Sequence, residues 1–136
     1  MPTTYPFYLA GKWESSDAPL TIRNPFNDEC LGTTFQASAD QLDRAITAAE
    51  SAFISQRRMP TFERSSILRE LAARLKQRRD EVAEMICREA GKPIREAEVE
   101  TDRGVFTLEI AAEEAKRIDG EVIPLDLLAA SQGRFG

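Results

Sequence analysis

Glu89-Ala90-Gly91-Lys92-Pro93 is the stretch of sequence that decides where two helices of this chain meet. A glycine just past a helix end can adopt a left-handed turn, because it has no Cβ to clash with the backbone. A proline two residues later cannot continue that helix, but it can open the next one, where its missing N–H is not needed. The stretch therefore predicts one helix that ends near Ala90 and another that begins at Pro93.

The helix that begins at Pro93 is predicted to be the longest in the chain, over residues 93–118. Gly104 lies in its middle and costs about 1 kcal/mol relative to alanine. We therefore expect another element to approach closely at Gly104. The predicted buried face recurs at helical spacing and consists of Ala97, Thr101, Val105, Leu108, Ala112 and Ala115.

Three further helices are predicted upstream, at residues 39–56, 61–78 and 81–90. Ser38 and Gln41 form a capping box for the first, and Asp80 is the expected cap of the third. Alternatively, the second and third are one bent helix. The apolar stripe of the first is Leu42, Ile46, Ala49 and Phe53, and the buried face of the third is Val82, Met85, Ile86 and either Glu89 or Ala90.

The first third of the chain, residues 1–37, has the short alternating apolar runs and turn residues that are typical of strands. Strands are expected at residues 7–9 and 12–13, on either side of Ala10-Gly11. Two more are expected at residues 20–22 and 31–36, on either side of an Asn24-Pro25 turn. Together with helices over residues 38–119, this pattern predicts an α+β segment that is mostly helical.

Composition and charge exclude several classes of function. The 136 residues carry a formal net charge of −5, which argues against a nucleic-acid-binding protein, since such proteins show a basic stripe. No apolar run approaches the ~20 residues that a membrane-spanning helix needs, so no membrane association is expected. The start of the chain does not resemble a signal peptide, and Cys30 and Cys87 stand in unlike contexts. A cytoplasmic protein with free thiols is therefore the simplest interpretation.

The sequence contains no residue pattern typical of a metal site. Histidine is absent, which removes the commonest metal ligand and the commonest general base. No glycine-rich phosphate-binding motif is present either.

Five motifs, in order along the chain, resemble segments of the NAD(P)-dependent aldehyde dehydrogenase superfamily. The strongest is Glu89-Ala90-Gly91-Lys92-Pro93 with Glu100, within the run EAGKPIREAEVETDRGVFTLEIAAEEAKRIDGEVIP of residues 89–124. The others are Leu9-Ala10-Gly11-Lys12-Trp13, Asn24-Pro25-Phe26-Asn27, the helix with Arg64, Leu68 and Leu71, and Gly120-Glu121-Val122-Ile123-Pro124. The resemblance implies an α/β parent fold in which residues 1–136 are the N-terminal part of the nucleotide-binding domain. Residues 120–136 would then begin its bridging or oligomerisation hairpin.

The resemblance also implies the chemistry of the parent enzyme. Such enzymes attack an aldehyde with a cysteine thiolate, pass hydride to NAD or NADP, and hydrolyse the resulting thioester with a glutamate-activated water. These parts, with the catalytic domain, are expected after Gly136. We therefore expect an inactive segment with no catalytic, cofactor-binding or metal-ligating residue. Cys30 follows an acidic turn that disfavours a thiolate, Cys87 lies within a predicted helix, and neither matches the catalytic motif.

Glu100 and Arg103 are the candidate substrate-entrance residues, because the resemblance places them near the opening through which the aldehyde enters. Family members that act on aldehydes with a phosphate or carboxylate tend to carry an arginine at the position of Arg103. A guanidinium suits such an anion because it can donate two parallel hydrogen bonds. The alternative is a surface arginine paired with a neighbouring acid. We hypothesise that the parent enzyme oxidises a small anionic aldehyde. Lys92 is not expected to be a catalytic lysine.

Two interpretations without catalysis remain open: a stand-alone helical module that binds a partner through Val105 and Leu108, and a regulatory stub that joins full-length subunits. The sequence near Phe135-Gly136 has the pattern of an interrupted strand, which argues against both. The long helix is expected to bury its apolar stripe against a downstream domain. Without that domain, we expect self-association through exposed helix faces or swapped elements.

Overall fold

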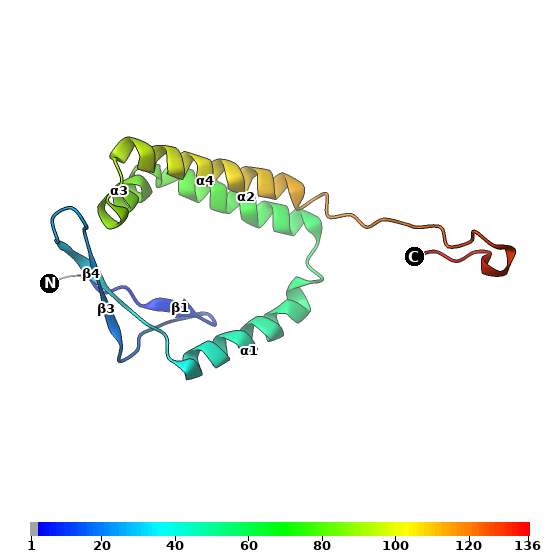
Figure 1. Cartoon of the computed structure of the whole chain (residues 1–136), viewed down its shortest axis with the longest axis horizontal. Coiled ribbons are helices and arrows are strands. Elements are labelled where there is room, and N and C mark those ends of the chain that lie inside the picture. Colours follow the sequence, from blue (N-terminus) through cyan, green and yellow to red (C-terminus); the bar gives the residue numbers. More distant parts are fainter. Residues whose placement is uncertain (1–2) are drawn as a thin grey trace.

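The computed structural model describes residues 3–136 as two small antiparallel sheets followed by four helices and a short 3-10 turn (Figure 1). The strands are β1 (Phe7–Leu9), β2 (Lys12–Glu14), β3 (Pro19–Arg23) and β4 (Cys30–Phe35). The helices are α1 (Ala39–Gln56), α2 (Thr61–Gln77), α3 (Arg79–Ala90) and α4 (Ile94–Glu114), and the 3-10 turn is η1 (Ala129–Ser131). Helix makes up 53% of the chain, so the predicted α+β, mostly helical segment is confirmed.

The predicted Ala10-Gly11 turn joins β1 and β2 into a hairpin. Both turn residues have positive φ, 47° and 89°, as two-residue hairpin turns of the primed type require. Tyr8 and Trp13 lie opposite each other across the hairpin, and their rings meet edge to face with centroids 5.1 Å apart.

The predicted Asn24-Pro25 turn joins β3 and β4. The side-chain oxygen of Asn24 accepts a hydrogen bond from the backbone N–H of Phe26 at 2.9 Å, as in an Asx turn. On β4, Gly32 is enclosed by the segment that precedes β1: a Cβ there would lie 2.5 Å from the ring of Tyr5. Glycine at this position therefore lets the N-terminal segment lie against the second sheet.

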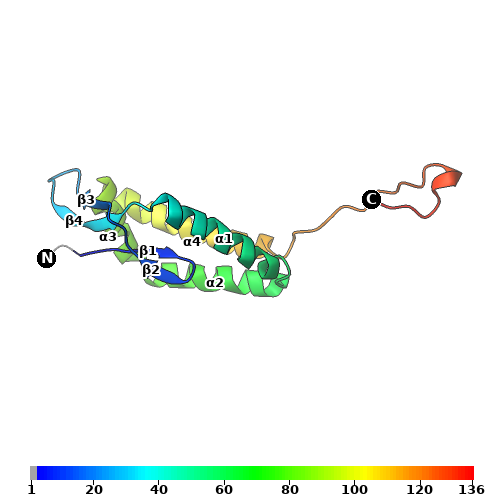
Figure 2. The same ribbon diagram turned by 90° about the horizontal axis from the view of Figure 1, so that it is seen from below.

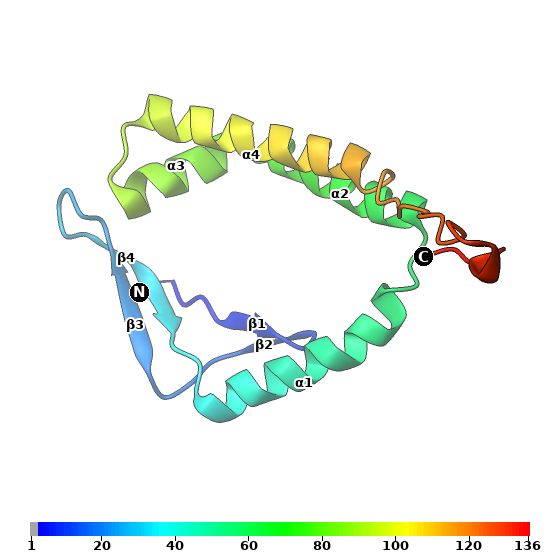
Figure 3. The ribbon, with the colours of Figure 1, turned by 45° about the vertical axis from the view of Figure 1, so that its right-hand side comes forward.

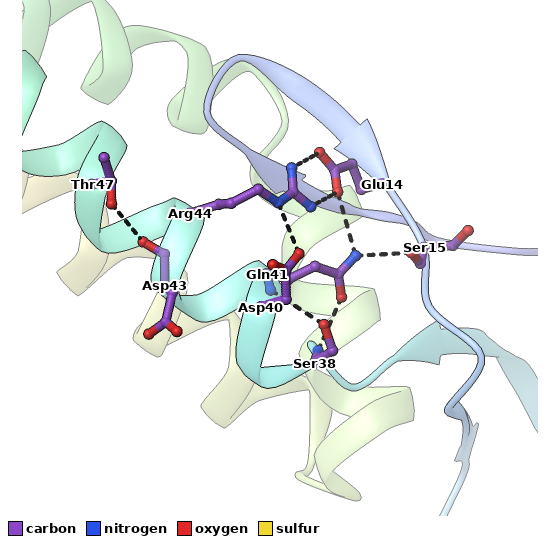
Figure 4. A network of polar contacts seen from close by, with 8 residues as sticks. All are labelled: Glu14, Ser15, Ser38, Asp40, Gln41, Asp43, Arg44 and Thr47. Carbon is purple, nitrogen blue, oxygen red and sulfur yellow. Dashed lines mark hydrogen bonds and ion pairs between the residues drawn. The ribbon is translucent and has the colours of Figure 1, made fainter.

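The predicted capping box begins α1, since Ser38 Oγ accepts from the N–H of Gln41 at 3.2 Å and Gln41 Oε1 accepts from the N–H of Ser38 at 3.0 Å. Polar contacts then attach α1 to the end of β2 (Figure 4). Arg44 donates two hydrogen bonds to the Glu14 carboxylate at 3.0 and 2.7 Å, and Gln41 donates to the Ser15 carbonyl at 3.0 Å. The hydrogen bond from Arg44 lowers the pKa of Glu14, which keeps this carboxylate ionised.

The predicted apolar stripe of α1 is exposed. Leu42, Ile46 and Phe53 are 58%, 51% and 60% exposed, whereas the polar Gln41 is buried. Figures 1 and 3 show the reason: α1 lies with the β1–β2 hairpin on one side of an open arrangement, and α2 and α4 lie on the other. The spacing of the stripe predicted the helix correctly but did not predict which side of it is covered.

The core lies where α2 and α3 pack on α4 (Figure 3). Small side chains form it: Ala72 of α2, Ala83 of α3, and Ala97 and Ala112 of α4 are at most 3% exposed. The predicted buried face of α4 is confirmed, with Leu108 half-buried and the other five residues buried: Ala97, Thr101, Val105, Ala112 and Ala115. The expectation that this stripe needs a downstream domain to cover it is wrong, because α2 and α3 cover it.

Gly104 lies beside α2, but the approach is less close than expected. A Cβ at Gly104 would lie 3.5 Å from Leu75 Cδ2, which is an ordinary van der Waals contact. We therefore expect Gly104→Ala to raise the free energy of unfolding by about 0.5–1 kcal/mol, because alanine restricts the unfolded chain and favours helix. The midpoint of urea denaturation, at unchanged m, measures this. A lower midpoint for Gly104→Ala would contradict it.

Three predicted features of α2 and α3 are wrong. The alternative of one bent helix fails because Arg78, with φ −103° and ψ 20°, separates the two helices. Asp80 is not a cap, because α3 begins one residue before it and Asp80 lies in the first turn. The buried residue of α3 is Ala83, whereas Met85 is 52% exposed and Glu89 and Ala90 are also exposed. α3 therefore packs on α4 through the small side chain of Ala83.

α4 is shorter at both ends than predicted. Pro93 is the N-cap, with an extended ψ of 138°, rather than the first helical residue. At the other end α4 stops at Glu114, and the predicted continuation to Ile118 is wrong. Ala115 is the last buried residue of the described chain, and residues 116–120 are exposed, so burial does not stabilise another helical turn there.

Residues 117–136 form an arm that leads away from the helices (Figures 1 and 2). The arm folds back on itself, with Pro124 bridged antiparallel to Phe135 and two hydrogen bonds, 2.9 and 3.0 Å, between Ile123 and Gly136. The predicted strand near Phe135 is thus represented by one bridge rather than a ladder. Among the helices of residues 3–136, none is long and apolar enough to cross a bilayer.

Candidate functional site

The outer side of α4 carries an open hollow of about 720 Å³. This α4 hollow is lined, among others, by Lys92, Arg95, Val99, Glu100, Arg103 and Thr107. Both residues that the sequence nominated, Glu100 and Arg103, therefore lie in the same hollow. They are on the opposite side of α4 from its buried face, because residues 97, 101 and 105 point into the core.

Glu100 forms an ion pair with Lys92 rather than with Arg103. Gly91 makes this possible: its left-handed conformation, with φ 69°, turns the chain at the end of α3 and leads it through Lys92 into α4. Gly91 also packs against the Asn24-Pro25 turn, since a Cβ there would lie 2.8 Å from Pro25 Cγ. The Gly91-Lys92-Pro93 junction is thus anchored by a turn far away in the sequence.

Asp102, the other acid next to Arg103 in sequence, is also engaged elsewhere. Arg79 of α3 donates to its two carboxylate oxygens at 2.7 and 2.9 Å. This hydrogen bonding lowers the pKa of Asp102 and raises the pKa of Arg79, so both stay charged at neutral pH. The pair fixes α3 to α4 on the side away from the hollow.

The guanidinium of Arg103 has no ion-pair partner within residues 3–136. Its backbone carbonyl accepts a hydrogen bond from Thr107 Oγ1 at 2.8 Å, a contact that does not involve the guanidinium. The alternative from the sequence, a surface arginine paired with a neighbouring acid, is therefore not what the described residues show. A free guanidinium in an open hollow can bind a carboxylate, sulfonate or phosphate by donating two parallel hydrogen bonds to it.

Two exposed apolar residues are neighbours of Arg103 by helical spacing. Val99 is 58% exposed and Phe106 62% exposed, four positions before and three positions after Arg103 on the helix. A cation with apolar neighbours at helical spacing fits a ligand that joins an anionic group to a short carbon chain.

A second groove, of about 440 Å³, lies between α3 and the β3–β4 sheet, and the sequence did not indicate it. Its walls include Ile22, Leu31 and Thr34 from the sheet and Glu84, Met85 and Glu89 from α3. An ion pair of 2.9 Å between Arg88 and Glu29 joins its two sides. Met85 was predicted to be buried, as was either Glu89 or Ala90. Helical spacing could not show that Met85 and Glu89 instead line a groove.

The cysteines and the acidic residues give no further candidate site within residues 3–136. Cys30 is exposed and Cys87 half-buried; both are free thiols, and neither lines the α4 hollow. Within residues 3–136, no group of three or more cysteine, aspartate and glutamate residues is placed to hold a metal ion.

Comparison with known proteins connects this geometry to a family. The profile described as "Aldehyde dehydrogenase family" matches residues 13–134. The chain belongs to the aldehyde dehydrogenase family. The resemblance seen in the five sequence motifs is thereby confirmed.

Relatives of this aldehyde dehydrogenase chain are several times its length. A 3-sulfolactaldehyde dehydrogenase from Priestia aryabhattai is 33% identical over 96% of this chain and 27% of its own length. The crystal structure of aldehyde dehydrogenase 21 from Physcomitrella patens, in complex with the reaction product succinate, superimposes with a TM-score of 0.92. It is 36% identical over 98% of this chain and 28% of that one.

A third relative, lactaldehyde dehydrogenase from Escherichia coli, superimposes with a TM-score of 0.87 at 31% identity, over 94% of this chain and 27% of that one. The chain thus spans about a quarter of the length of the relatives it matches.

Proposed function

We propose that this chain forms the N-terminal part of an enzyme that oxidises an aldehyde to a carboxylic acid with NAD or NADP. Membership of the aldehyde dehydrogenase family, with an alignment over a quarter of each relative's length, carries this proposal. The nucleophilic cysteine, the water-activating glutamate and the cofactor-binding surface would come from other residues of a longer protein. The segment alone is then inactive.

In this proposal the contribution of the segment is to the substrate rather than to the bond-making steps. Arg103 would bind the anionic group of a small aldehyde at the entrance, with Glu100 beside it. The unpaired guanidinium and its apolar neighbours support this role. Two of the relatives above also point to anionic compounds, since sulfolactaldehyde carries a sulfonate and succinate is a dicarboxylate.

A neutral hydroxyaldehyde is the second candidate substrate, because the Escherichia coli relative is named for lactaldehyde. The two can be distinguished by steady-state kinetics of the full-length enzyme with succinate semialdehyde, butanal and lactaldehyde. Succinate semialdehyde and butanal have the same number of carbons and differ in the terminal carboxylate. We expect kcat/KM for succinate semialdehyde to exceed that for butanal by about tenfold or more, the value of one charge-assisted contact. Equal values, or a preference for lactaldehyde, would contradict the anionic-substrate proposal.

The position of the segment in the whole enzyme is also a proposal. Residues 1–136 would be the first part of the nucleotide-binding domain, and residues 120–136 would begin the bridging hairpin through which subunits associate. The arm supports this because it exposes large apolar side chains: Leu127, Leu128 and Phe135 are 86%, 72% and 67% exposed. The exposed stripe of α1 is a further surface for self-association. The free thiols support a cytoplasmic enzyme.

A non-catalytic module that binds through Val105 and Leu108 is less well supported. Val105 is 8% exposed, and the face that it shares with Leu108 is covered by the packing of α4 on its neighbours. That face is therefore not available to a partner.

A further inference from the structure

We infer that Lys92 is a positioning residue: its ion pair with Glu100 keeps that carboxylate away from Arg103 and leaves the guanidinium open to an anionic substrate. The inference rests on the proposed role of Arg103 and deepens it. It assigns to the lysine of the Gly91-Lys92-Pro93 junction a role in selectivity, without any part in bond making.

Helix geometry makes Glu100 the carboxylate best placed to neutralise Arg103. Side chains three and four positions apart are neighbours on a helix surface, and oppositely charged pairs at this spacing attract each other. At this spacing Arg103 has four neighbours, namely Val99, Glu100, Phe106 and Thr107. Glu100 is the one acid among them, so its pairing decides whether Arg103 is neutralised from within α4.

The structure shows Glu100 paired with Lys92 instead. Lys92 precedes α4, so its side chain reaches Glu100 from the N-terminal end of the helix, away from Arg103. Arg95, the other arginine of the α4 hollow, is five positions from Glu100 and thus outside the neighbour spacing. If Lys92 lost its charge, Arg103 would be the cation best placed to pair with Glu100.

Asp102 does not compete for Arg103, because Arg79 holds both of its carboxylate oxygens. Two cations from outside α4, Lys92 and Arg79, therefore engage the two acids nearest to Arg103 in sequence. The effect favours anionic ligands, since a neutral aldehyde gains less from a free guanidinium than a carboxylate does.

The test compares kcat/KM for succinate semialdehyde with kcat/KM for butanal in the full-length enzyme; their quotient is the selectivity ratio. We expect Lys92→Gln to lower the ratio about two- to fivefold, the range of exposed charge pairs, through a higher KM for the anionic aldehyde. The double variant Lys92→Gln/Glu100→Gln should restore the ratio, because the competing carboxylate is gone. Lys92→Arg should keep it, because the ion pair survives.

Lys116→Gln is the matched control. It also removes a lysine paired with a glutamate, Glu113, on α4, but at the far end from Arg103. The same change of charge there should leave the ratio unchanged.

Two results would overturn the inference: an unchanged ratio for Lys92→Gln, or an equal fall in the single and the double variant. The second would mean that Lys92 acts by its own charge and not through Glu100. If Lys92→Gln folds poorly, Glu100→Gln and Lys92→Arg still decide, because the first must not lower the ratio and the second must preserve it. Arg103→Ala distinguishes failure of this inference from failure of the proposed function. If Arg103→Ala leaves the selectivity ratio unchanged, the substrate proposal itself is overturned. If Arg103→Ala lowers the ratio but Lys92→Gln does not, only the inference about Lys92 is overturned.

Discussion

Replacing Arg103 with alanine in the full-length enzyme should lower kcat/KM for succinate semialdehyde by about 10- to 100-fold and change kcat/KM for butanal little. The range follows from the value of a hydrogen bond to a charged group, about 1.5–3 kcal/mol. The guanidinium is free of ion-pair partners within residues 3–136, so no internal ion pair is lost with it. The effect should therefore fall on the ligand and not on stability. Steady-state kinetics with the two aldehydes measures it.

Arg95→Ala is the control for Arg103→Ala. Arg95 lines the same hollow on the same helix, so the variant removes an equal charge from the same region. A selective loss for Arg103→Ala that Arg95→Ala does not reproduce would show a specific contact. A comparable loss for both variants would instead show a general electrostatic attraction of anions to the hollow, whose size depends on salt concentration. Equal effects of Arg103→Ala on both aldehydes would contradict the predicted role.

Gly91→Ala should lower the free energy of unfolding by about 2–4 kcal/mol. One part is backbone strain of about 1–2 kcal/mol, because an alanine at a φ of 69° is in the left-handed region. The other is steric, since the new Cβ would lie 2.8 Å from the rigid ring of Pro25. Urea denaturation followed by circular dichroism measures the sum.

Two further variants separate these parts. Gly120→Ala, where a Cβ would meet nothing within 4 Å and φ is not positive, should change stability by less than about 0.5 kcal/mol. Pro25→Ala combined with Gly91→Ala should recover the steric part, as a double-mutant cycle would show. A Gly91→Ala variant as stable as the parent would mean that neither the turn nor the contact with Pro25 is required.

Several local sequence signals were reliable where the interaction spans a few residues, although Asp80 as a cap and Pro93 as the first helical residue were wrong. The Ser38–Gln41 capping box, the Ala10-Gly11 turn and the left-handed Gly91 all formed as predicted, because each depends on neighbours within four positions. The choice of buried face was less reliable. The apolar stripe of α1 is exposed and α3 buries Ala83 rather than Met85, because periodicity shows that a face exists but not what covers it.

In the candidate site too, the sequence predicted the residues but not their partners. The sequence nominated Glu100 and Arg103 through a family resemblance, and it could not tell whether they pair with each other. Long charged side chains reach several partners at nearly equal energy, so their choice depends on the backbone positions of other elements. The position of α3 brings Arg79 to Asp102, and the turn at Gly91 brings Lys92 to Glu100.

By itself, then, the sequence determined the family, the order of strands and helices, and the turn that joins α3 to α4. The elements and the turn could be predicted because caps, turns and periodicity depend on residues that are close together in the sequence. The tertiary structure alone decided that Pro25 packs on Gly91, that α2 and α3 cover the small residues of α4, and that Arg103 stays unpaired. Each of these depends on groups brought together by folding, whose contacts no local pattern encodes.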